Sequence, residues 1–419
     1  MQPNCLALCL LLGGAALQRC GDGLFPSAAL AGEIWNRLAF EPANPVEIDQ
    51  IMHIPDGYLS PSTCATFYVV AASGWYAALK RIKRLLATRA IPLISVFAAF
   101  CFVVMMFNVP LPGGTTGHAV GVGISAIVLG PWGSILAISI ALAIQALFFG
   151  DGGITTLGAN CFNMAMVGSF TAYAVYRLVA ANSDLKSRQR VLAAAIAGYV
   201  AINASALVTA VELGIQPRLF HDSSGTPLYA PYPLHVAIPA MMIGHLTFAG
   251  LAEAVIAAGM VSYLQRADLG LLSGVSGGSG FAATPPPASA TTTAGASAEP
   301  SPGRLWWIVA CLMLFTPLGI LAAGTAWGEW SSSAFMNPHA RDQIAATSGN
   351  HAPPSSVPAG IQRLSNIWTA PFPGYAPSFI RNQMFGYLLS AIFGVGFLVL
   401  LALVARAIGR KWSTGNLRL

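Results

Sequence analysis

The sequence predicts an all-α integral membrane protein, because a very low charge content is combined with repeated apolar runs of membrane-spanning length. Only 9% of the 419 residues are charged, 55% are hydrophobic and the mean hydropathy is +0.64. Soluble globular chains carry about 25% charged residues. A helix needs about 20 residues to cross roughly 30 Å of hydrocarbon, and this chain offers several runs of that length.

The apolar runs predict nine helices in two groups. Eight long runs cover residues 62–80, 91–108, 133–150, 159–181, 190–213, 235–264, 305–327 and 383–406, and a shorter Gly-rich run lies near 118–130. Turn signals such as Gly130-Pro131 separate neighbouring runs. A Gly/Ser/Ala/Pro tract at 269–304 is typical of a flexible linker, which we expect on the cytoplasmic side. It divides a seven-helix domain at 52–268 from a two-helix domain at 305–419.

Two further segments lie outside the expected bundle. The outer loop at 328–380 is longer than most connections in compact domains, which indicates either a functional element or local disorder. Residues 1–51 resemble a poor secretory signal, with an apolar run from Leu6 to Leu17 but no basic residues before it. We interpret them as a processed leader or as an N-terminal extension that is assigned in error.

Basic residues gather on one side of this nine-helix topology. Fifteen fall on that side, namely Lys80, Arg81, Lys83, Arg84, Arg89, Arg177, Lys186, Arg188, Arg190, Arg266, Arg304, Arg406, Arg410, Lys411 and Arg418. Four fall on the other side, namely Arg218, Arg341, Arg363 and Arg381. Since Lys and Arg near the ends of spans stay in the cytoplasm, we expect the segment after Met52 to face outward. The net charge of +6 follows from this topology and requires no nucleic-acid partner.

The stretch MHIPDGYLSP, from Met52 to Pro61, carries the most specific chemistry. A Met-His pair at a free N-terminus offers one cation the α-amine of Met52 and the backbone amide and imidazole of His53. These nitrogens close fused chelate rings, and such a near-planar set suits Ni(II), Cu(II) or Co(II), whereas Mg(II) and Ca(II) prefer oxygen. This interpretation requires a mature chain that begins at Met52. The alternative is that Met52 is an ordinary residue of an extended segment.

Two further segments are expected at the same outer face. The loop FNVPLPGGTTGH ends at His118, and its Pro and Gly residues permit an irregular path that a helix would not take. A neutral His118 imidazole there would complete a four-nitrogen plane, although His118 alone is also typical of a hydrogen-bonded helix start. The segment DGGITTLGANCFNMA begins at Asp151. Its Asp151, Asn160 and Asn163 are candidates to hydrogen-bond a ligating imidazole.

Other titratable residues give weaker signals. His235 and His245 are ten residues apart, which puts them about 80° away from a shared helix face. His221, His339 and His351 fall in outer loops and are expected to be solvated. Glu212 and Glu253 are costly against lipid, so we expect them to point into the bundle or to lie near an interface.

Two other classes of protein are alternatives. An intramembrane zinc metalloenzyme that uses His53, His118 and Asp151 would need an HExxH-type pair or a catalytic carboxylate beside an open coordination site, and neither pattern occurs. A secondary carrier or channel should show internal repeats or intramembrane charges along a path, and we find no repeat.

Taken together, MHIPDGYLSP, NVPLPGGTTGH, DGGITTLGANCFNMA and GHLTFAGLAEAVI resemble the substrate-specificity subunit of cobalt and nickel energy-coupling-factor transporters, the CbiM/NikM family. The resemblance covers residues 52–268 and implies a seven-helix bundle with an outward N-terminus. It also implies metal ligation by the Met52 amine, the His53 amide and imidazole, and the His118 imidazole. Residues 305–419, with TAWGEW and NIWTAPFPGYAP, resemble the family's CbiN/NikN component more loosely. The extension 1–51 departs from the family, since Met52 would have no free amine while it remained attached.

The resemblance also implies a function. A subunit of this kind would sit in the bacterial cytoplasmic membrane, capture Co(II) or Ni(II) at the outer face and deliver it inward, without a permanently bound cofactor. It would act with a CbiQ/NikQ-like transmembrane coupling subunit and CbiO/NikO-like ATPase subunits. In agreement, the chain has no GxxxxGK[ST] phosphate-binding loop. The sequence does not choose between cobalt and nickel.

Overall fold

The structure is a computed structural model that describes residues 53–82, 90–111, 115–273, 303–322, 324–377 and 379–415. All of them lie in one compact unit that spans Asp49–Leu419. Met52, the predicted leader at 1–51 and most of the predicted linker fall outside the described residues, as do the basic residues Lys83, Arg84 and Arg89.

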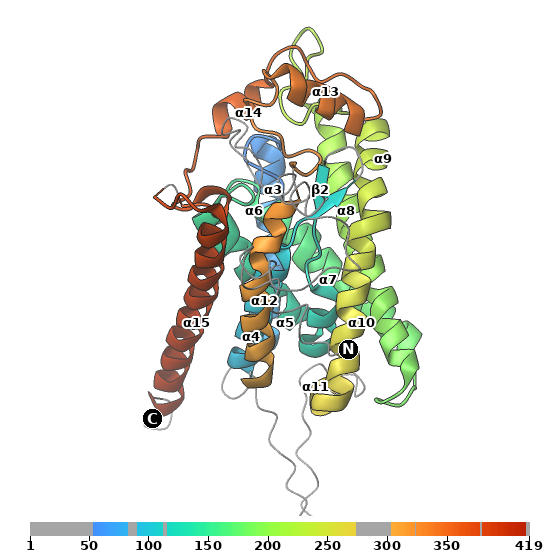
Figure 1. Cartoon of the computed structure of the whole chain (residues 1–419), viewed down its shortest axis with the longest axis vertical. Coiled ribbons are helices and arrows are strands. Elements are labelled where there is room, and N and C mark those ends of the chain that lie inside the picture. The colour runs from blue at the N-terminus through green and yellow to red at the C-terminus, as the bar shows by residue number, and fades with distance from the viewer. Residues whose placement is uncertain are drawn as a thin grey trace, which may run out of the picture. The chain divides into compact units, whose positions relative to one another are not determined.

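Helices dominate the described chain, as the sequence predicts (Figure 1). The first part contains α3 (Pro61–Ile82), α4 (Ala90–Met105), β1 (Val109–Leu111), β2 (Thr115–Gly117), α5 (Val122–Ile144), η3 (Gln145–Phe149), α6 (Leu157–Asn160), η4 (Cys161–Val167), α7 (Gly168–Ala180), α8 (Arg188–Leu219), α9 (Leu234–Gly244), η5 (His245–Ala249), α10 (Gly250–Ala267) and α11 (Gly270–Ser273). The second part contains α12 (Gly303–Phe315), η6 (Thr316–Leu321), α13 (Pro338–Thr347), α14 (Ala359–Leu364), η7 (Pro373–Tyr375) and α15 (Gln383–Gly415). Among the described residues, 5 helical stretches are long and apolar enough to cross a membrane.

The predicted short helix near 118–130 is the first half of α5. Gly130 has φ 68 and ψ 170, which is not helical, so α5 consists of two segments that meet there. Pro131 lacks the N–H that would continue the first segment. Next to the break, the Arg81 guanidinium lies 4.2 Å from the ring centroid of Trp132. The Gly130-Pro131 turn therefore lies at the end of the bundle where α3 finishes.

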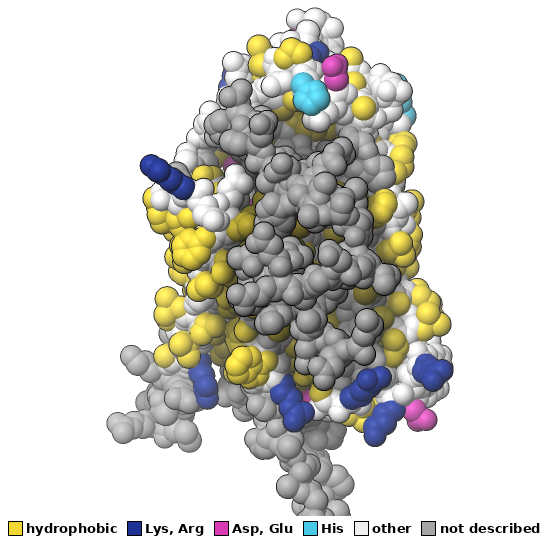
Figure 2. All heavy atoms as spheres, in the orientation of Figure 1, with side chains coloured by type: hydrophobic (Ala, Val, Ile, Leu, Met, Phe, Trp, Pro, Cys, Tyr) yellow, Lys and Arg dark blue, Asp and Glu magenta, His cyan; other side chains and the backbone are white. Residues whose placement is uncertain are grey.

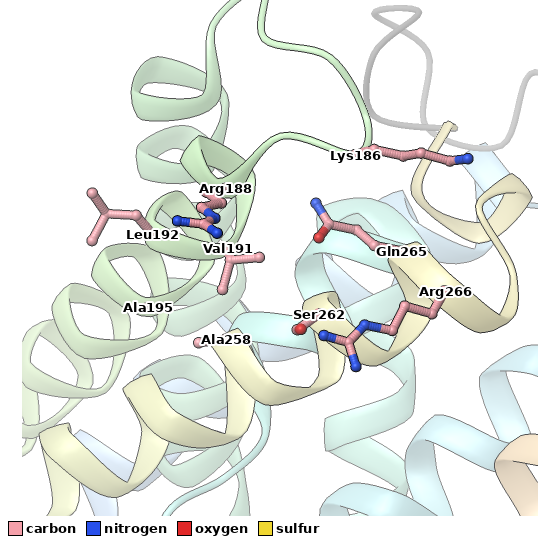
Figure 3. Close-up of a pocket in the computed structure, with 9 residues that line it drawn as sticks. All are labelled: Lys186, Arg188, Val191, Leu192, Ala195, Ala258, Ser262, Gln265 and Arg266. Carbon is pink, nitrogen blue, oxygen red and sulfur yellow. The ribbon is translucent and has the colours of Figure 1, made fainter.

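Lys and Arg side chains gather at that end. Figure 2 shows most of those visible on this face at the lower end, below a belt of hydrophobic side chains. Between the start of α8 and the end of α10, Lys186, Arg188 and Arg266 line a cleft of about 670 Å³ (Figure 3). There the Gln265 side chain of α10 donates to the carbonyls of Leu185 and Ser187, directly before α8, each at 2.9 Å.

The first part of the chain differs from the all-α prediction in one small element. The predicted irregular loop before His118 contains a two-stranded antiparallel ladder that pairs Val109 with Gly117, Pro110 with Thr116 and Leu111 with Thr115. Leu111 is buried at the end of β1. Its side chain approaches the backbone of η5 and α9, since a Cβ added to Gly244 would lie 2.6 Å from a Leu111 methyl.

The second part packs along α4 and over the end of the bundle where α3 begins. Helices α12 and α15 both contact α4, and the Tyr387 hydroxyl of α15 donates to the Met106 carbonyl at 2.9 Å. Figure 1 shows α13 and α14 above the start of α3. Of the two alternatives for the long outer loop, its described residues show an ordered element. Phe372 donates from its backbone to the Phe148 carbonyl at 2.9 Å, and Gly360 to the Leu228 carbonyl at 2.6 Å.

Candidate metal site

The chain segment after Met52 is held in place through its backbone. The Ile54 amide donates to the Asn160 side-chain oxygen at 3.1 Å, and the Ile54 carbonyl accepts from the Asn160 amide at 3.1 Å. The same carbonyl accepts from the Gly153 backbone at 3.0 Å and from the Thr156 hydroxyl at 2.5 Å. Every backbone group of this residue is thus used, which fixes the position of the neighbouring His53.

Two glycines let the segment approach the loop after Asp151. A Cβ on Gly153 would lie 2.4 Å from the Asp56 backbone nitrogen, and one on Gly152 would lie 2.9 Å from the His53 Cβ. Gly152 also has φ +87, which only glycine adopts without strain. Asp56 completes the contact by accepting from the backbone amides of Ile154 at 3.1 Å and Thr155 at 2.7 Å. The glycines of DGGITT are therefore required for close packing around His53.

The structure brings His53 and His118 together although they are far apart in sequence. Their ring centroids are 5.1 Å apart and their planes are inclined by 74°. Both are buried, with 3% and 7% of their surfaces exposed. The Nδ1 atom of His118 lies 2.9 Å from the Ala119 carbonyl. Since a carbonyl only accepts, this Nδ1 carries the proton and Nε2 carries the lone pair in the neutral ring.

The His53 ring has a different environment. Its Nδ1 lies 2.9 Å from Oδ1 of Asp151, which is a contact at ion-pair distance. Its Nε2 is buried and has no hydrogen-bond partner among the described residues. A buried polar atom without a partner costs about 1–3 kcal/mol. In proteins an ordered water or an ion satisfies such an atom, so His53 is the first candidate to bind an ion.

His118 is positioned by a carboxylate from another helix. Glu253 of α10 is fully buried and accepts from the backbone amides of Val120 at 2.8 Å, Gly121 at 2.8 Å and Gly123 at 2.9 Å. These amides are otherwise unsatisfied donors where α5 begins, and a negative charge there is favourable. Glu253 therefore fixes the chain directly after His118. The sequence predicts its inward orientation, and the structure supplies the partners.

Loss of this carboxylate should destabilise the bundle. We expect Glu253→Ala to lower the free energy of unfolding by about 3 kcal/mol or more, because it leaves three buried N–H groups without an acceptor. Thermal unfolding of the purified protein in detergent measures this. Glu253→Gln should lose less stability than the Ala variant, since its amide oxygen still accepts at one position while its amide nitrogen cannot accept at the other. Equal stability of the Ala variant and the wild type would contradict this role.

Asp151 links His53 to the second part of the chain. Its Oδ2 accepts from the Tyr375 hydroxyl at 2.6 Å, and Gln145 donates to that hydroxyl at 2.9 Å. Burial by itself raises the pKa of the Asp151 carboxyl, but the His53 imidazole and the Tyr375 hydroxyl beside it bring the pKa below its ordinary value. Asp151 is therefore ionised and places a negative charge next to the His53 ring.

Both imidazoles line a small cavity of about 70 Å³. Its walls also include His245, whose Nδ1 lies 2.9 Å from the Met241 carbonyl, and Trp327 and Glu329 from the long outer loop. The Thr115 hydroxyl donates to the Thr325 carbonyl at 2.8 Å, which holds that loop beside β2. The cavity is thus bounded by both parts of the chain.

The predicted site residues fall into three groups. His53, His118 and Asp151 meet, Asn160 holds the Ile54 backbone, and Met52 lies outside the described residues. Among the described residues, the Asn163 side chain bonds to neither imidazole. It donates instead to the Thr209 hydroxyl at 3.0 Å and to the Glu212 carboxylate at 2.8 Å. In the described part of the chain, no three His, Cys, Asp or Glu side chains are arranged to hold an ion.

Sequence reasoning missed three residues of this region, Glu329, Tyr375 and His245. The first two belong to the part of the chain beyond the predicted linker, and no spacing rule connects them to His53. His245 lies in the motif GHLTFAG, which the sequence analysis did use, but its distance from His235 on the helix argued against a shared site. The other outer histidines, His221, His339 and His351, are exposed, as predicted.

Comparisons with known proteins identify the family of this chain. The family model CbiM, described as a cobalt uptake substrate-specific transmembrane region, matches residues 53–270. The fused nickel transport protein NikMN of Rhodobacter capsulatus is 49% identical over 349 residues, which are 83% of this chain and 95% of that protein. The "Probable fused nickel transport protein LarMN" of Lactiplantibacillus plantarum is 38% identical over 354 residues, 84% of this chain and 96% of that protein.

A solved structure of a truncated transition metal transporter has 53% sequence identity and a TM-score of 0.48, and the match covers 51% of this chain and 98% of that one. The family model matches the whole segment that carries His53, His118 and Asp151, and the fused nickel transport proteins align through the second part as well. This chain therefore belongs to the CbiM family.

Proposed function

We propose that this protein is the substrate-binding membrane subunit of a metal importer, which captures Ni(II) or Co(II) at the outer face and delivers it to the cytoplasm. The observation that carries the proposal is the pair His53 and His118. Two buried imidazoles from separate segments face one cavity, and the Nε2 atom of His53 has no hydrogen-bond partner among the described residues.

The geometry of the pair fits a shared ion. With metal–nitrogen bonds of about 2 Å, the ring centroids of two imidazoles on one ion lie roughly 4 to 7 Å apart, and the observed separation is 5.1 Å. Only Nδ1 of His53 closes a six-membered ring with its own amide nitrogen. The Met52 amine would then complete the five-membered ring, and His118 would take the fourth position, opposite the amide and beside the His53 ring.

This ligand set selects the class of metal. Four nitrogens in a plane suit Ni(II), Cu(II) and Co(II), and exclude the oxygen-preferring Mg(II) and Ca(II). Nickel is the first metal to test, because the two relatives that align with more than four fifths of this chain are both named nickel transport proteins. Cobalt is the second, since the family model describes cobalt uptake.

Uptake requires an orientation and an energy source. We place the His53 end outside, since Lys186, Arg188 and Arg266 lie at the opposite end of the bundle and basic residues stay in the cytoplasm. The family resemblance adds a transmembrane coupling subunit and ATPase subunits as partners.

Metal binding by the purified chain that begins at Met52 tests the proposal. We expect about one equivalent of Ni(II) or Co(II) per protein by calorimetric titration and by metal analysis, and no competition from excess Mg(II). Uptake of radioactive nickel by cells that express the chain with its partner subunits tests transport separately. A purified protein that binds neither Ni(II) nor Co(II) would reject the function.

The contacts of Asp151 with His53 and Tyr375 predict how much each substitution weakens Ni(II) binding. We expect Asp151→Asn to weaken Ni(II) binding by about 10- to 100-fold, because the Asp151 carboxylate lies beside the same Nδ1 that would bind the ion and compensates the ion's charge. Tyr375→Phe should weaken binding less, since the carboxylate stays and loses one donor. Tyr387→Phe is the comparison variant, because the Tyr387 hydroxyl donates to the Met106 carbonyl and not to Asp151. Calorimetric titration with Ni(II) measures the affinity of the three variants. Equal affinities of Tyr375→Phe and Tyr387→Phe would contradict the expected order.

A further inference from the structure

A cleft at the end of the bundle opposite His53 has no part in the metal site. It lies between the start of α8 and the end of α10 and has a volume of about 670 Å³ (Figure 3). We call it the basic cleft. Its lining combines three basic, two polar and four apolar residues, namely Lys186, Arg188 and Arg266, Ser262 and Gln265, and Val191, Leu192, Ala195 and Ala258. Charged and apolar side chains thus share one cleft.

The three basic side chains have no counter-charge. Among the described residues, none of them forms an ion pair or a side-chain hydrogen bond. The acidic residues nearest to them in the chain are Asp184 and Asp268, and neither of these lines the cleft. Three like charges around one hollow create a positive potential, which attracts an anion.

The backbone that carries these charges is held in place by the protein itself. Gln265 of α10 donates to the carbonyls of Leu185 and Ser187, each at 2.9 Å. The buried Arg190 guanidinium donates to the Ser183 carbonyl at 2.7 and 3.0 Å. Ser187 makes no side-chain bond to the first turn of α8, so the amides there add to the positive potential. The basic cleft is therefore preformed, which lowers the entropic cost of binding a ligand.

The basic cleft runs from the membrane surface into the depth of the hydrocarbon. Both helices that form its walls are long and apolar enough to span a membrane, and Arg188 and Arg266 lie at their ends. Ala195 follows Arg188 by seven residues. Ala258 precedes Arg266 by eight, so at 1.5 Å per residue both alanines lie about 10 to 12 Å deeper. Leu192 is 58% exposed, so this wall faces the surrounding lipid.

This gradient distinguishes two kinds of anion. A free phosphate ion would contact only the charged end of the cleft and would leave its apolar floor empty. A phospholipid carries a phosphate and acyl chains in one molecule, so it would fill both parts. Basic pockets between membrane helices on the cytoplasmic side bind anionic lipid headgroups in this way.

We propose that the basic cleft binds one anionic phospholipid of the membrane, with its phosphate between the basic side chains and an acyl chain along Ala195 and Ala258. In the orientation given above, the lipid belongs to the cytoplasmic leaflet. The inference requires only that the bundle spans a membrane, and it does not depend on which metal the protein carries.

Native mass spectrometry of the full chain in detergent tests the inference, with phosphatidylglycerol and phosphatidylcholine as the probes. The wild type should bind one phosphatidylglycerol more tightly than phosphatidylcholine, whose headgroup adds a positive charge. Arg188→Gln combined with Arg266→Gln should weaken phosphatidylglycerol binding about 30-fold, because each basic residue near an anionic lipid contributes a factor of about five. The melting temperature without lipid should stay unchanged, since neither side chain bonds to the described chain.

The matched control removes two charges from the same end of the bundle but outside the cleft. Lys80 and Arg177 are exposed in the last turns of α3 and α7. Lys80→Gln combined with Arg177→Gln should bind phosphatidylglycerol like the wild type. An equal loss in both double variants would overturn the inference, because net charge and not the cleft would then determine binding.

A substitution in the apolar floor separates a phospholipid from a free anion. Ala258→Leu keeps all three charges and fills the space for the acyl chain, so it should weaken phosphatidylglycerol binding, and excess inorganic phosphate should not displace the lipid from the wild type. Wild-type affinity in Ala258→Leu, or displacement by phosphate, would show a site for small anions and overturn the inference. Equal binding of both lipids by the wild type would also overturn it, as expected if the cleft receives a protein partner instead.

Discussion

Ni(II) binding should be abolished by His118→Ala while the membrane fold stays intact. The substitution removes one of the four proposed nitrogens, and its cost should exceed the roughly 100-fold loss that follows removal of an outer-shell partner. The fold should survive, because the polypeptide around His118 is held by the Glu253 carboxylate and by the β1–β2 ladder, and neither involves the imidazole. His53→Ala should have the same effect for the same reason.

Calorimetric titration of equal amounts of folded protein measures this loss. His221→Ala is the matched control, because His221 is exposed and its Nδ1 lies 3.0 Å from the Asp222 carbonyl in an outer loop. Its affinity should equal that of the wild type. If His118→Ala bound Ni(II) as tightly as the control, His118 would be removed from the site.

A free amine at Met52 should be equally necessary. We expect a chain that begins at Met52 to bind Ni(II), and the same chain with a Gly-Ser extension before Met52 to lose high-affinity binding. The extension turns the amine into an amide and breaks the five-membered chelate ring. The same extension at the C-terminus, after Leu419, is the control and should leave the affinity unchanged.

N-terminal sequencing of the membrane-inserted protein shows which form the cell makes. The amine-ligand hypothesis expects Met52 as the first residue, with residues 1–51 absent from the active protein. An active transporter that retained those residues would contradict it, and so would full affinity of the N-terminally extended chain.

The sequence predicted those features that depend on local patterns. Apolar runs located the helices, and the Gly and Pro residues before His118 marked a non-helical path. The motif MHIPDG and the loop after Asp151 were identified separately, and the structure joins them through Ile54, Gly153 and Asn160. Each of these features follows from the chemistry of a few adjacent residues.

Contacts between distant segments could not be predicted in this way. Tyr375 and Asp151 are 224 residues apart, and their pairing depends on how the outer loop folds over the bundle. Asn163 is a residue for which the prediction from sequence spacing was wrong. It follows Asn160 by three residues and was expected to share its role, but the helix between them turns its side chain toward Thr209 and Glu212 of α8.

The second part of the chain forms one wall of the cavity, and this affects how the two parts assemble. Glu329 and Tyr375 reach the site from a segment that is covalently joined to the bundle between Ser273 and Gly303. A peptide tether gives the two parts that it joins an effective concentration on the order of millimolar. Docking of the outer loop is thus independent of how much protein the cell makes. A substitution in its contacts that would dissociate two separate polypeptides should leave this fused chain assembled.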